Sequence, residues 1–100
     1  MIQIVSLSYK GAVNSSEMTE YRERVRPLLV KYGAERVSSA RVLDAEPDDP
    51  IEIHVTRFAD NEGYAAMLAD PDYLALEELR NTAMKHVRNY VTEEYVVFLD

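Results

Sequence analysis

The sequence has no cysteine and no tryptophan, and only three of its 100 residues are glycine. A chain without cysteine has no disulfide, no thiolate nucleophile and no cysteine ligand for a metal. Three scattered glycines do not make a phosphate-binding loop. Histidine, carboxylate, arginine and tyrosine side chains are the candidates for chemistry that we consider.

Basic residues are also scarce, with 11 Lys and Arg against 18 Asp and Glu and a net charge of −7. This balance argues against nucleic acid and anionic membranes as partners, because both attract clustered positive charge. No apolar run approaches the roughly 18 residues of a membrane helix, and the N-terminal MIQIVSLSYK indicates a strand instead of a signal peptide. We expect one domain over residues 1–100, in the cytoplasm.

The periodicity of apolar residues predicts the order βαββαβ. The expected strands are Ile2–Tyr9, Glu35–Ala45, Ile51–Phe58 and Asn89–Leu99. Between the second and third strands, the stretch 46–50 contains two prolines and predicts a turn. Its acidic residues lack the spacing of a calcium loop.

Local signals place the helix ends. The first helix is expected to begin at Asn14–Ser16 and to end before Gly33, with a kink or an early break near Arg26 because Pro27 follows. The second helix is expected to begin after Asp60 and to bend or restart at Asp70, where an Asp-Pro pair forms a new cap.

Apolar residues occur at both parities of the first and last predicted strands, as in Ile4 with Val5 and Val97 with Phe98. Two helices cover only one face of a four-stranded sheet, so the other apolar face needs a partner. We expect a homodimer formed by sheet-to-sheet packing, since a twofold axis buries the same patch on both chains.

Two passages carry a resemblance to a known family. EYRERVRPLLVKYGAE has a tyrosine near its start, then Pro-Leu-Leu and a terminal glycine, and VTRFADNEGYAAMLADPDYLALEELRNTA contains Asp-Pro-x-Tyr-x-x-Leu-x-x-x-Arg. Together they resemble the dimeric α+β barrel superfamily, in particular its small members of unknown function related to antibiotic-biosynthesis monooxygenases and EthD-like proteins. The resemblance implies a ferredoxin-like α+β fold. It also implies a range of activities, among them cofactor-free monooxygenases, cyclases and lactone isomerases, beside members without a known reaction.

His54 is the strongest catalytic candidate, because it shares one face of its strand with Glu52 and Thr56. A histidine enclosed among polar groups could act as a general base, with a carboxylate or a tyrosine orienting it. The alternative is a structural or exposed histidine. His86 is expected near the end of the second helix, where its cation would suit the helix dipole.

Arginines and tyrosines supply further candidates. Arg41 and Arg57 could bind a carboxylate or an enolate, or could instead form salt bridges across the hairpin. Arg80, which matches the family's arginine, could reach a cleft or pair with Glu77. Three tyrosines are candidates to hydrogen-bond a ligand from an apolar wall or to be ordinary core residues: Tyr9, Tyr64 and Tyr73.

The sequence thus predicts a homodimer that binds a small, mostly apolar organic molecule. The catalytic hypothesis is a cofactor-free cyclase or isomerase with His54 as base and Arg41 or Tyr9 polarising a carbonyl; Glu52, Thr56, Tyr64, Tyr73 and Arg80 would bind the substrate. One alternative is a non-catalytic metabolite-binding or accessory dimer. Another is a cofactor-free monooxygenase, although the second helix lacks the histidines expected of the quinol-monooxygenase type. We expect no cofactor and no metal.

Overall fold

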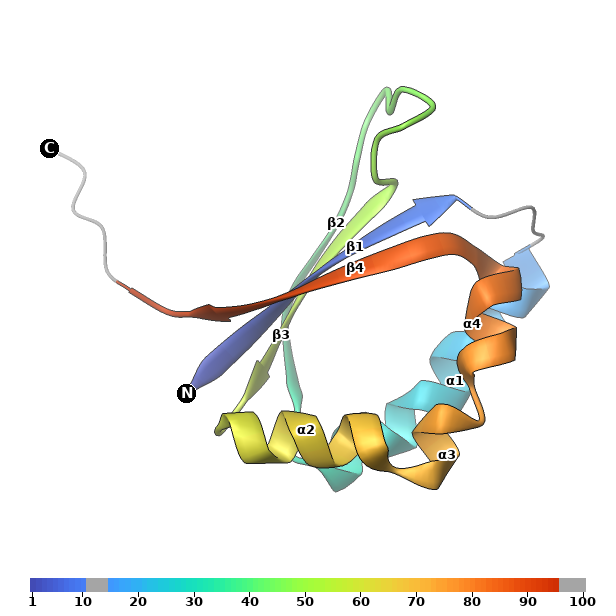
Figure 1. The fold of residues 1–100 in the computed structure, drawn as a ribbon. Coiled ribbons are helices and arrows are strands. Elements are labelled where there is room, and N and C mark those ends of the chain that lie inside the picture. Colours follow the sequence, from blue (N-terminus) through green and yellow to red (C-terminus); the bar gives the residue numbers. More distant parts are fainter. Residues whose placement is uncertain (11–14, 96–100) are drawn as a thin grey trace, which may run out of the picture.

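The computed structural model describes residues 1–10 and 15–95 (Figure 1). Its strands are β1 (Ile2–Lys10), β2 (Glu35–Arg41), β3 (Glu52–Phe58) and β4 (Met84–Glu93), and its helices are α1 (Ser15–Lys31), α2 (Asn61–Ala69), α3 (Pro71–Leu74) and α4 (Glu77–Ala83). The strands form one antiparallel sheet in the order β2-β3-β1-β4, and the helices lie on one side of it (Figure 1). The predicted ferredoxin-like α+β fold is confirmed.

Helix α1 ends as its sequence predicts. Gly33 has a φ of 68°, its N–H bonds to the Val30 carbonyl at 3.1 Å, and the N–H of Ala34 bonds to the Leu29 carbonyl at 2.8 Å. These two bonds form a Schellman motif, which satisfies carbonyls that the helix end leaves open. Helix α1 continues through Pro27 to Lys31, so an early break near Arg26, one of the two expected effects of Pro27, is wrong.

The second predicted helix is divided into α2, α3 and α4. The Asp60 side chain accepts a bond from the N–H of Gly63 at 2.9 Å and caps α2. The Asp70 side chain accepts from the N–H of Asp72 at 2.8 Å and caps α3, with Pro71 in the first turn. The predicted restart at Asp70 is confirmed, and it turns the chain back over the sheet toward α4 (Figure 1).

Two strand boundaries differ from the prediction. β2 stops at Arg41 and not at Ala45, because the chain turns at Asp44, whose φ is 55°. β4 runs from Met84 to Glu93 and so begins well before Asn89, because pairing with the whole length of β1 overrides the weak strand propensity of its first residues. The end of the predicted strand, residues 96–99, lies outside the described residues.

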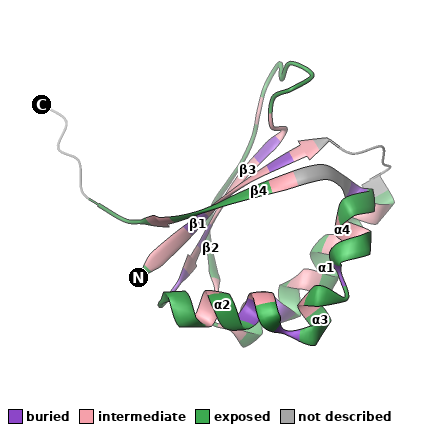
Figure 2. Ribbon diagram, in the orientation of Figure 1, coloured by how far each residue is buried: buried purple, intermediate pink, exposed green. Residues whose placement is uncertain are grey.

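The early start of β4 also corrects the predicted position of His86. This residue is not at a helix end but in β4, where it pairs with Tyr9 of β1. Figure 2 shows that the β2–β3 tip and the far end of β4 are exposed, whereas burial concentrates where the helices meet the sheet. No helix in the described part of the chain is long and apolar enough to cross a membrane.

The apolar core lies between one end of the sheet and the helices. Its fully buried members come from β1, α1, β3, α2 and the turn before α4: Ile4, Leu28, Phe58, Met67 and Leu76. The partly buried α1 residues that pack against them include Tyr21, Val25, Leu29 and Tyr32, as the helical periodicity predicts. This core holds α1 and α4 above the rest of the sheet, where the side chains are polar.

The opposite sheet face is apolar at its centre. Val5 pairs with Val55 on one side and Tyr90 on the other, and Leu7 pairs with Ile53. Because neighbouring residues of a strand point to opposite faces, these side chains point away from the helix-facing Ile4 and Ser8. We call this set, Val5, Leu7, Ile53, Val55 and Tyr90, the outer face.

Candidate functional site

A cavity of about 620 Å³ lies between the sheet and the helices. Its apolar end is formed by core residues such as Ile4, Phe58 and Met67. Its other end is formed by polar side chains of all four strands: Ser6, Ser8, Arg36, Ser39, Arg41, Glu52, His54, Thr56 and Asn89. The helix-facing side of the sheet is therefore polar above the core, which is unusual for a covered face and favours a binding site.

His54 lies on this polar wall and is hydrogen-bonded on both ring nitrogens. Its Nε2 is 3.2 Å from Oε1 of Glu52, and its Nδ1 is 2.9 Å from Oγ of Ser39. The Ser39–His54 hydrogen bond joins two neighbouring strands, because Ser39 of β2 lies directly opposite His54 of β3. The question of which face His54 occupies is thus answered: it faces the helices.

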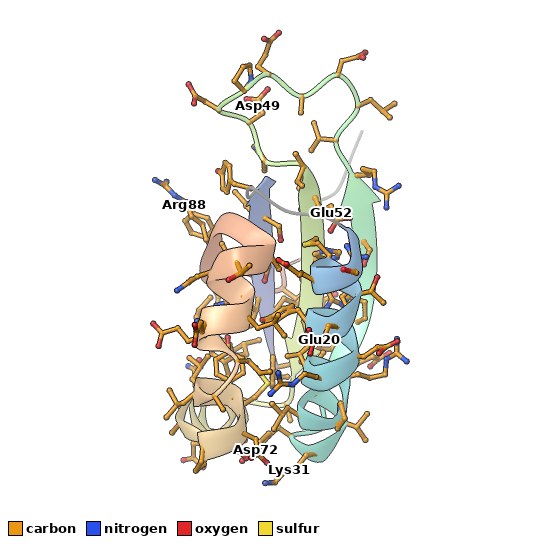
Figure 3. All side chains as sticks on the ribbon, turned by 90° about the vertical axis from the view of Figure 1, so that its right-hand side faces the viewer. Glu20, Lys31, Asp49, Glu52, Asp72 and Arg88 are labelled. Atoms are coloured by element: carbon orange, nitrogen blue, oxygen red, sulfur yellow. The ribbon has the colours of Figure 1, made fainter. Side chains whose placement is uncertain are left out.

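Glu52 is the central carboxylate of the cavity and is 8% exposed. The Nη2 of Arg22 on α1 donates to both of its oxygens, at 2.7 and 3.0 Å, and the Nη2 of Arg41 lies 3.6 Å from Oε2. Burial alone would raise the pKa of Glu52, but the Arg22 guanidinium and His54 outweigh it and lower that pKa. Glu52 is therefore ionised at neutral pH (Figure 3, where it lies beside the N-terminal half of α1).

Burial lowers the pKa of His54, and the nearby Arg36 guanidinium lowers it further, while Glu52 opposes both. His54 is therefore neutral at pH 7. An ionised carboxylate only accepts, so Nε2 carries the hydrogen that is donated to Glu52. Nδ1 then keeps its lone pair and accepts from the Ser39 hydroxyl. The geometry thus gives a neutral imidazole whose basic nitrogen is Nδ1.

Tyrosines and Arg80 form the wall on the helix side. The Nη1 of Arg80 donates to the Tyr73 hydroxyl at 2.9 Å, and its guanidinium lies 5.4 Å from the centre of the Tyr73 ring. Burial raises the pKa of Tyr21 and of Tyr64, so both hydroxyls stay protonated. A second cavity of about 350 Å³ adjoins this wall, since Tyr64, Tyr73 and Arg80 line both.

The structure brings most of the predicted site residues together. Seven of them line the larger cavity: Arg41, Glu52, His54, Thr56, Tyr64, Tyr73 and Arg80. Arg80 contacts Tyr73, and not Glu77, which was the alternative to its reaching a cleft. Arg41 forms the ion pair with Glu52 that was the alternative to ligand binding.

Two predicted residues lie elsewhere. Tyr9 is at an odd position of β1 and points to the side of the sheet away from His54, so it does not line the cavity. Arg57 also lies on that side, with Nη1 3.9 Å from Glu35 and Nη2 3.7 Å from Glu94. Neither residue belongs to the cavity, because both occupy strand positions whose side chains point away from the helices.

Three cavity residues were missed by the sequence reasoning: Arg22, Arg36 and Ser39. Arg22 follows the core-facing Tyr21 in α1, and a residue at the edge of an apolar stripe can reach over the sheet. Arg36 and Ser39 share the helix-facing side only because the register of β2 shifts between Arg36 and Ser38. No sequence signal marks that irregularity.

The described residues contain no group of three or more histidine, aspartate or glutamate side chains able to hold a metal ion. The carboxylate nearest to His54 is Glu52, and it is already held by Arg22. What this arrangement can do is accept a proton at Nδ1 while Glu52 stabilises the resulting imidazolium.

Comparison with known proteins agrees with the fold. Residues 7–95 match the family described as Domain of unknown function (DUF1330). No curated protein matches the sequence significantly. Among solved structures, a protein of unknown function from Rhodopseudomonas palustris superposes with a TM-score of 0.78 at 15% identity, covering 96% of this chain and 83% of its own.

Two further structures have the same architecture. A dimeric ferredoxin-like protein of unknown function from Thermobifida fusca has a TM-score of 0.67 at 11% identity, covering 93% of this chain and 90% of its own. An EthD family protein from Bacillus halodurans has a TM-score of 0.67 at 14% identity, covering 95% of this chain and 99% of its own. At these identities the likeness concerns the fold alone.

Proposed function

This chain belongs to the DUF1330 family, and from that premise we propose that it is a homodimer that binds a small organic molecule between sheet and helices and transfers a proton on it without a cofactor. The observation that carries the proposal is a neutral His54 in a cavity of about 620 Å³, with its tautomer fixed by Glu52. A neutral imidazole is the usual general base near pH 7, and a substrate C–H group would replace the Ser39 hydroxyl at the Nδ1 lone pair.

The proposed step is an isomerase or cyclase type of proton transfer. Nδ1 of His54 removes a proton from a carbon next to a carbonyl group, and Glu52 stabilises the imidazolium that forms. A cationic or hydroxyl donor, such as Arg41 or Tyr73, polarises the carbonyl oxygen as negative charge develops there. His54 then returns the same proton to a second carbon, so that no oxidant or cofactor is consumed.

The dimer is supported by the outer face. Its central side chains are apolar, and Tyr90 is 47% exposed in the single subunit. An apolar sheet surface of this kind is expected to be covered by another copy of the chain, because a twofold arrangement buries the same patch twice. The dimeric state named for the ferredoxin-like protein from Thermobifida fusca agrees with this proposal.

A second candidate is a non-catalytic dimer that binds a metabolite. The observation that favours it is that both nitrogens of His54 already have partners within the chain, Ser39 and Glu52. A histidine satisfied in this way can be purely structural. The cofactor-free monooxygenase stays a prediction from the resemblance.

Proton transfer is tested by hydrogen–deuterium exchange. The protein is incubated in D₂O with phenylacetone or phenylpyruvate, and NMR follows the loss of the protons next to the carbonyl group. The wild type should accelerate exchange, and His54→Gln should reduce that acceleration by about a hundredfold or more, the usual contribution of a general base. Arg24→Gln, an exposed substitution beside Glu20, is the matched control and should have no effect.

Equal exchange by His54→Gln and the wild type would remove His54 from the mechanism. Binding of either compound without any exchange would favour the non-catalytic dimer instead. Melting curves of both variants establish that the comparison is between folded proteins.

A further inference from the structure

The cavity has a positive lining in a negative protein. Five arginines line it, from α1, β2 and α4: Arg22, Arg26, Arg36, Arg41 and Arg80. Among the described lining residues only Glu52 is a carboxylate, and His54 is neutral. The whole chain carries −7, so positive charge is concentrated at this one place.

Glu52 does not neutralise all of these arginines. Its two oxygens are taken by Arg22, at 2.7 and 3.0 Å, with Arg41 further away at 3.6 Å. Glu52 also accepts from Nε2 of His54, and its single negative charge balances only one of the five positive charges. The remaining cavity arginines need another anion.

Arg80 and Arg36 are the two that matter most. Arg80 is partly buried, and its guanidinium interacts with tyrosine hydroxyls, donating to that of Tyr73 at 2.9 Å and lying close to that of Tyr21. Arg36 has no hydrogen bond or ion pair to any residue in the described part of the chain; Glu52 attracts its charge from a distance, but burial and the charge of Arg22 outweigh that attraction. The Tyr21 hydroxyl interacts with both Arg36 and Arg80, so the two guanidinium groups approach the same part of the cavity.

Crowding makes the lack of an anion costly. Burial and the charge of Arg22 both lower the pKa of Arg36, which means that its cation is destabilised where it stands. A guanidinium in a partly dry site beside a second guanidinium is stabilised by an anion that bridges them. The apolar end of the cavity, formed by residues such as Val25 and Leu29, would at the same time accept a hydrocarbon body.

We propose that the ligand of this cavity is a small organic carboxylate, received by Arg36 and Arg80, with its apolar body against the apolar end. This inference names the ligand class of the proposed function and rests on it only in using the same cavity. An organic carboxylate fits better than inorganic phosphate, because its hydrocarbon body also contacts the apolar end of the cavity. The carboxylate would also hold a neighbouring C–H group near His54.

The test compares three probes of defined charge by NMR chemical-shift titration. Phenylacetate carries the carboxylate, 2-phenylacetamide has the same body without charge, and inorganic phosphate is an anion without the body. Phenylacetate should bind at least about tenfold more tightly than the amide, the order of size expected for a charge-assisted contact. Inorganic phosphate should compete poorly.

Substitution of each arginine tests whether Arg36 and Arg80 bind the carboxylate. Arg36→Gln and Arg80→Gln should each weaken phenylacetate binding by about tenfold and leave amide binding unchanged. Arg24→Gln, outside the cavity on the same helix as Arg22, should leave all three titrations unchanged. Equal affinity for acid and amide, unchanged phenylacetate binding in both arginine variants, or tighter binding of phosphate than of phenylacetate would overturn the proposal.

The His54→Gln variant separates this inference from the proposed function. It should bind phenylacetate as the wild type does, while losing proton exchange. If exchange is absent from the wild type but carboxylate binding depends on Arg36 and Arg80, the carboxylate site stands and the catalytic role of His54 falls. If exchange depends on His54 but acid and amide bind alike, the carboxylate site falls alone.

Discussion

Glu52 and His54 determine each other's protonation state. Glu52 stays ionised because Arg22 and His54 donate to it, and His54 keeps its Nε2 hydrogen because Glu52 can only accept. Arg36 adds a positive charge that disfavours the imidazolium. The three side chains come from β3 and β2, next to a helix that supplies Arg22, so the state of the base depends on contacts between elements.

We predict that His54 titrates below its ordinary pKa of 6.5, because burial and Arg36 disfavour its cation. Folding then favours the neutral ring, so this contribution to stability is present above pH 6.5 and is lost as the pH falls through the folded pKa. Catalysed proton exchange should decline over the same acid range. Histidine NMR titration measures the pKa, and His54→Gln identifies the signal.

Glu52→Gln provides a second test of the same electrostatics. Glu52 raises the pKa of His54, so its replacement by a neutral amide should lower the His54 pKa further. An upward shift in this variant would contradict the assignment of Glu52 as the group that stabilises the imidazolium. A wild-type titration above pH 6.5 would instead contradict the predicted effect of burial and Arg36.

For single residues, the sequence predicts which side chains of one strand share a face, because neighbouring residues alternate between the two faces. Glu52, His54 and Thr56 were found because they are two residues apart, and all three line the cavity. Arg22, Arg36 and Ser39 were missed because their positions depend on how α1 and an irregular β2 lie over β3. Tyr9 and Arg57 were misplaced because a residue type does not reveal strand parity relative to the helices.

At the scale of elements, Asp70 joins three segments. It caps α3, accepts from Lys31 Nζ at 2.9 Å and accepts from the Tyr32 hydroxyl at 2.5 Å. These bonds attach the C-terminal end of α1 to the junction between α2 and α3, and they leave Asp70 6% exposed. The position of α4 and Arg80 over the cavity depends on this junction.

We predict that Asp70 controls acid stability. The Tyr32 hydroxyl, Lys31 and the Asp72 N–H lower the pKa of the Asp70 carboxyl from 3.8 to about 2. A carboxyl with a lowered folded pKa stabilises the protein above its unfolded pKa, so this contribution is full above pH 3.8 and is lost as the pH falls toward about 2. Asp70→Asn keeps an N-cap acceptor but removes the charge.

Denaturant unfolding from pH 2 to pH 7 measures the effect. Asp70→Asn should be less stable than the wild type at pH 7, and the two stabilities should converge toward pH 2. A constant difference across the whole range would mean that the ionised carboxylate is not the source. Asp48→Asn, in the exposed hairpin tip, is the control and should give the wild-type curve.

Gly33 gives a prediction about backbone conformation alone. A Cβ at this position would meet no atom within 4 Å, so the cost of Gly33→Ala comes only from its φ of 68°. We expect a loss of ~1–2 kcal/mol of stability and a melting temperature lower by several degrees. Gly33→Asn should cost less, because asparagine tolerates the left-handed region. Identical melting curves for alanine and glycine would contradict the Schellman assignment.

Helix ends marked by a capping residue could be predicted, whereas the end of β2 and the start of β4 could not. Asp60, Asp70 and Gly33 act within a few residues of themselves, so their roles are legible in the sequence. The start of β4 at Met84 and the end of β2 at Arg41 depend on pairing with distant strands. The continuity of α1 through Pro27 likewise depends on packing of α1 against the rest of the molecule.

At the scale of the whole molecule, the two faces of the sheet have exchanged their usual character. The helix-covered face is polar above the core, where Glu52 and His54 lie, and the uncovered outer face is apolar. The sequence predicted apolar residues on both faces, because odd and even strand positions both carry them. This alternation does not show that the helix-facing side is apolar at one end, in the core, and polar at the other, in the cavity. An apolar face turned away from the helices is the surface on which we propose that a second subunit packs.

We predict that Val55→Asp on the outer face dissociates the dimer. Val55 lies between strands at the centre of that face and pairs with Val5, so a carboxylate there would have to lose its hydration on dimer formation. Sedimentation velocity at micromolar concentration should give twice the subunit mass of 11.5 kDa for the wild type and 11.5 kDa for Val55→Asp. Circular dichroism checks that the variant is folded.

Leu43→Asp is the matched control for this experiment. Leu43 is 85% exposed near the tip of the β2–β3 hairpin, away from the outer face, so the same kind of substitution should leave the dimer intact. A wild type that sediments as a single 11.5 kDa species would show that the outer face tolerates water, and the proposed assembly would be wrong. The cavity and His54 face the other side of the sheet, so carboxylate binding by Val55→Asp then reveals whether the site of one subunit is complete without its partner.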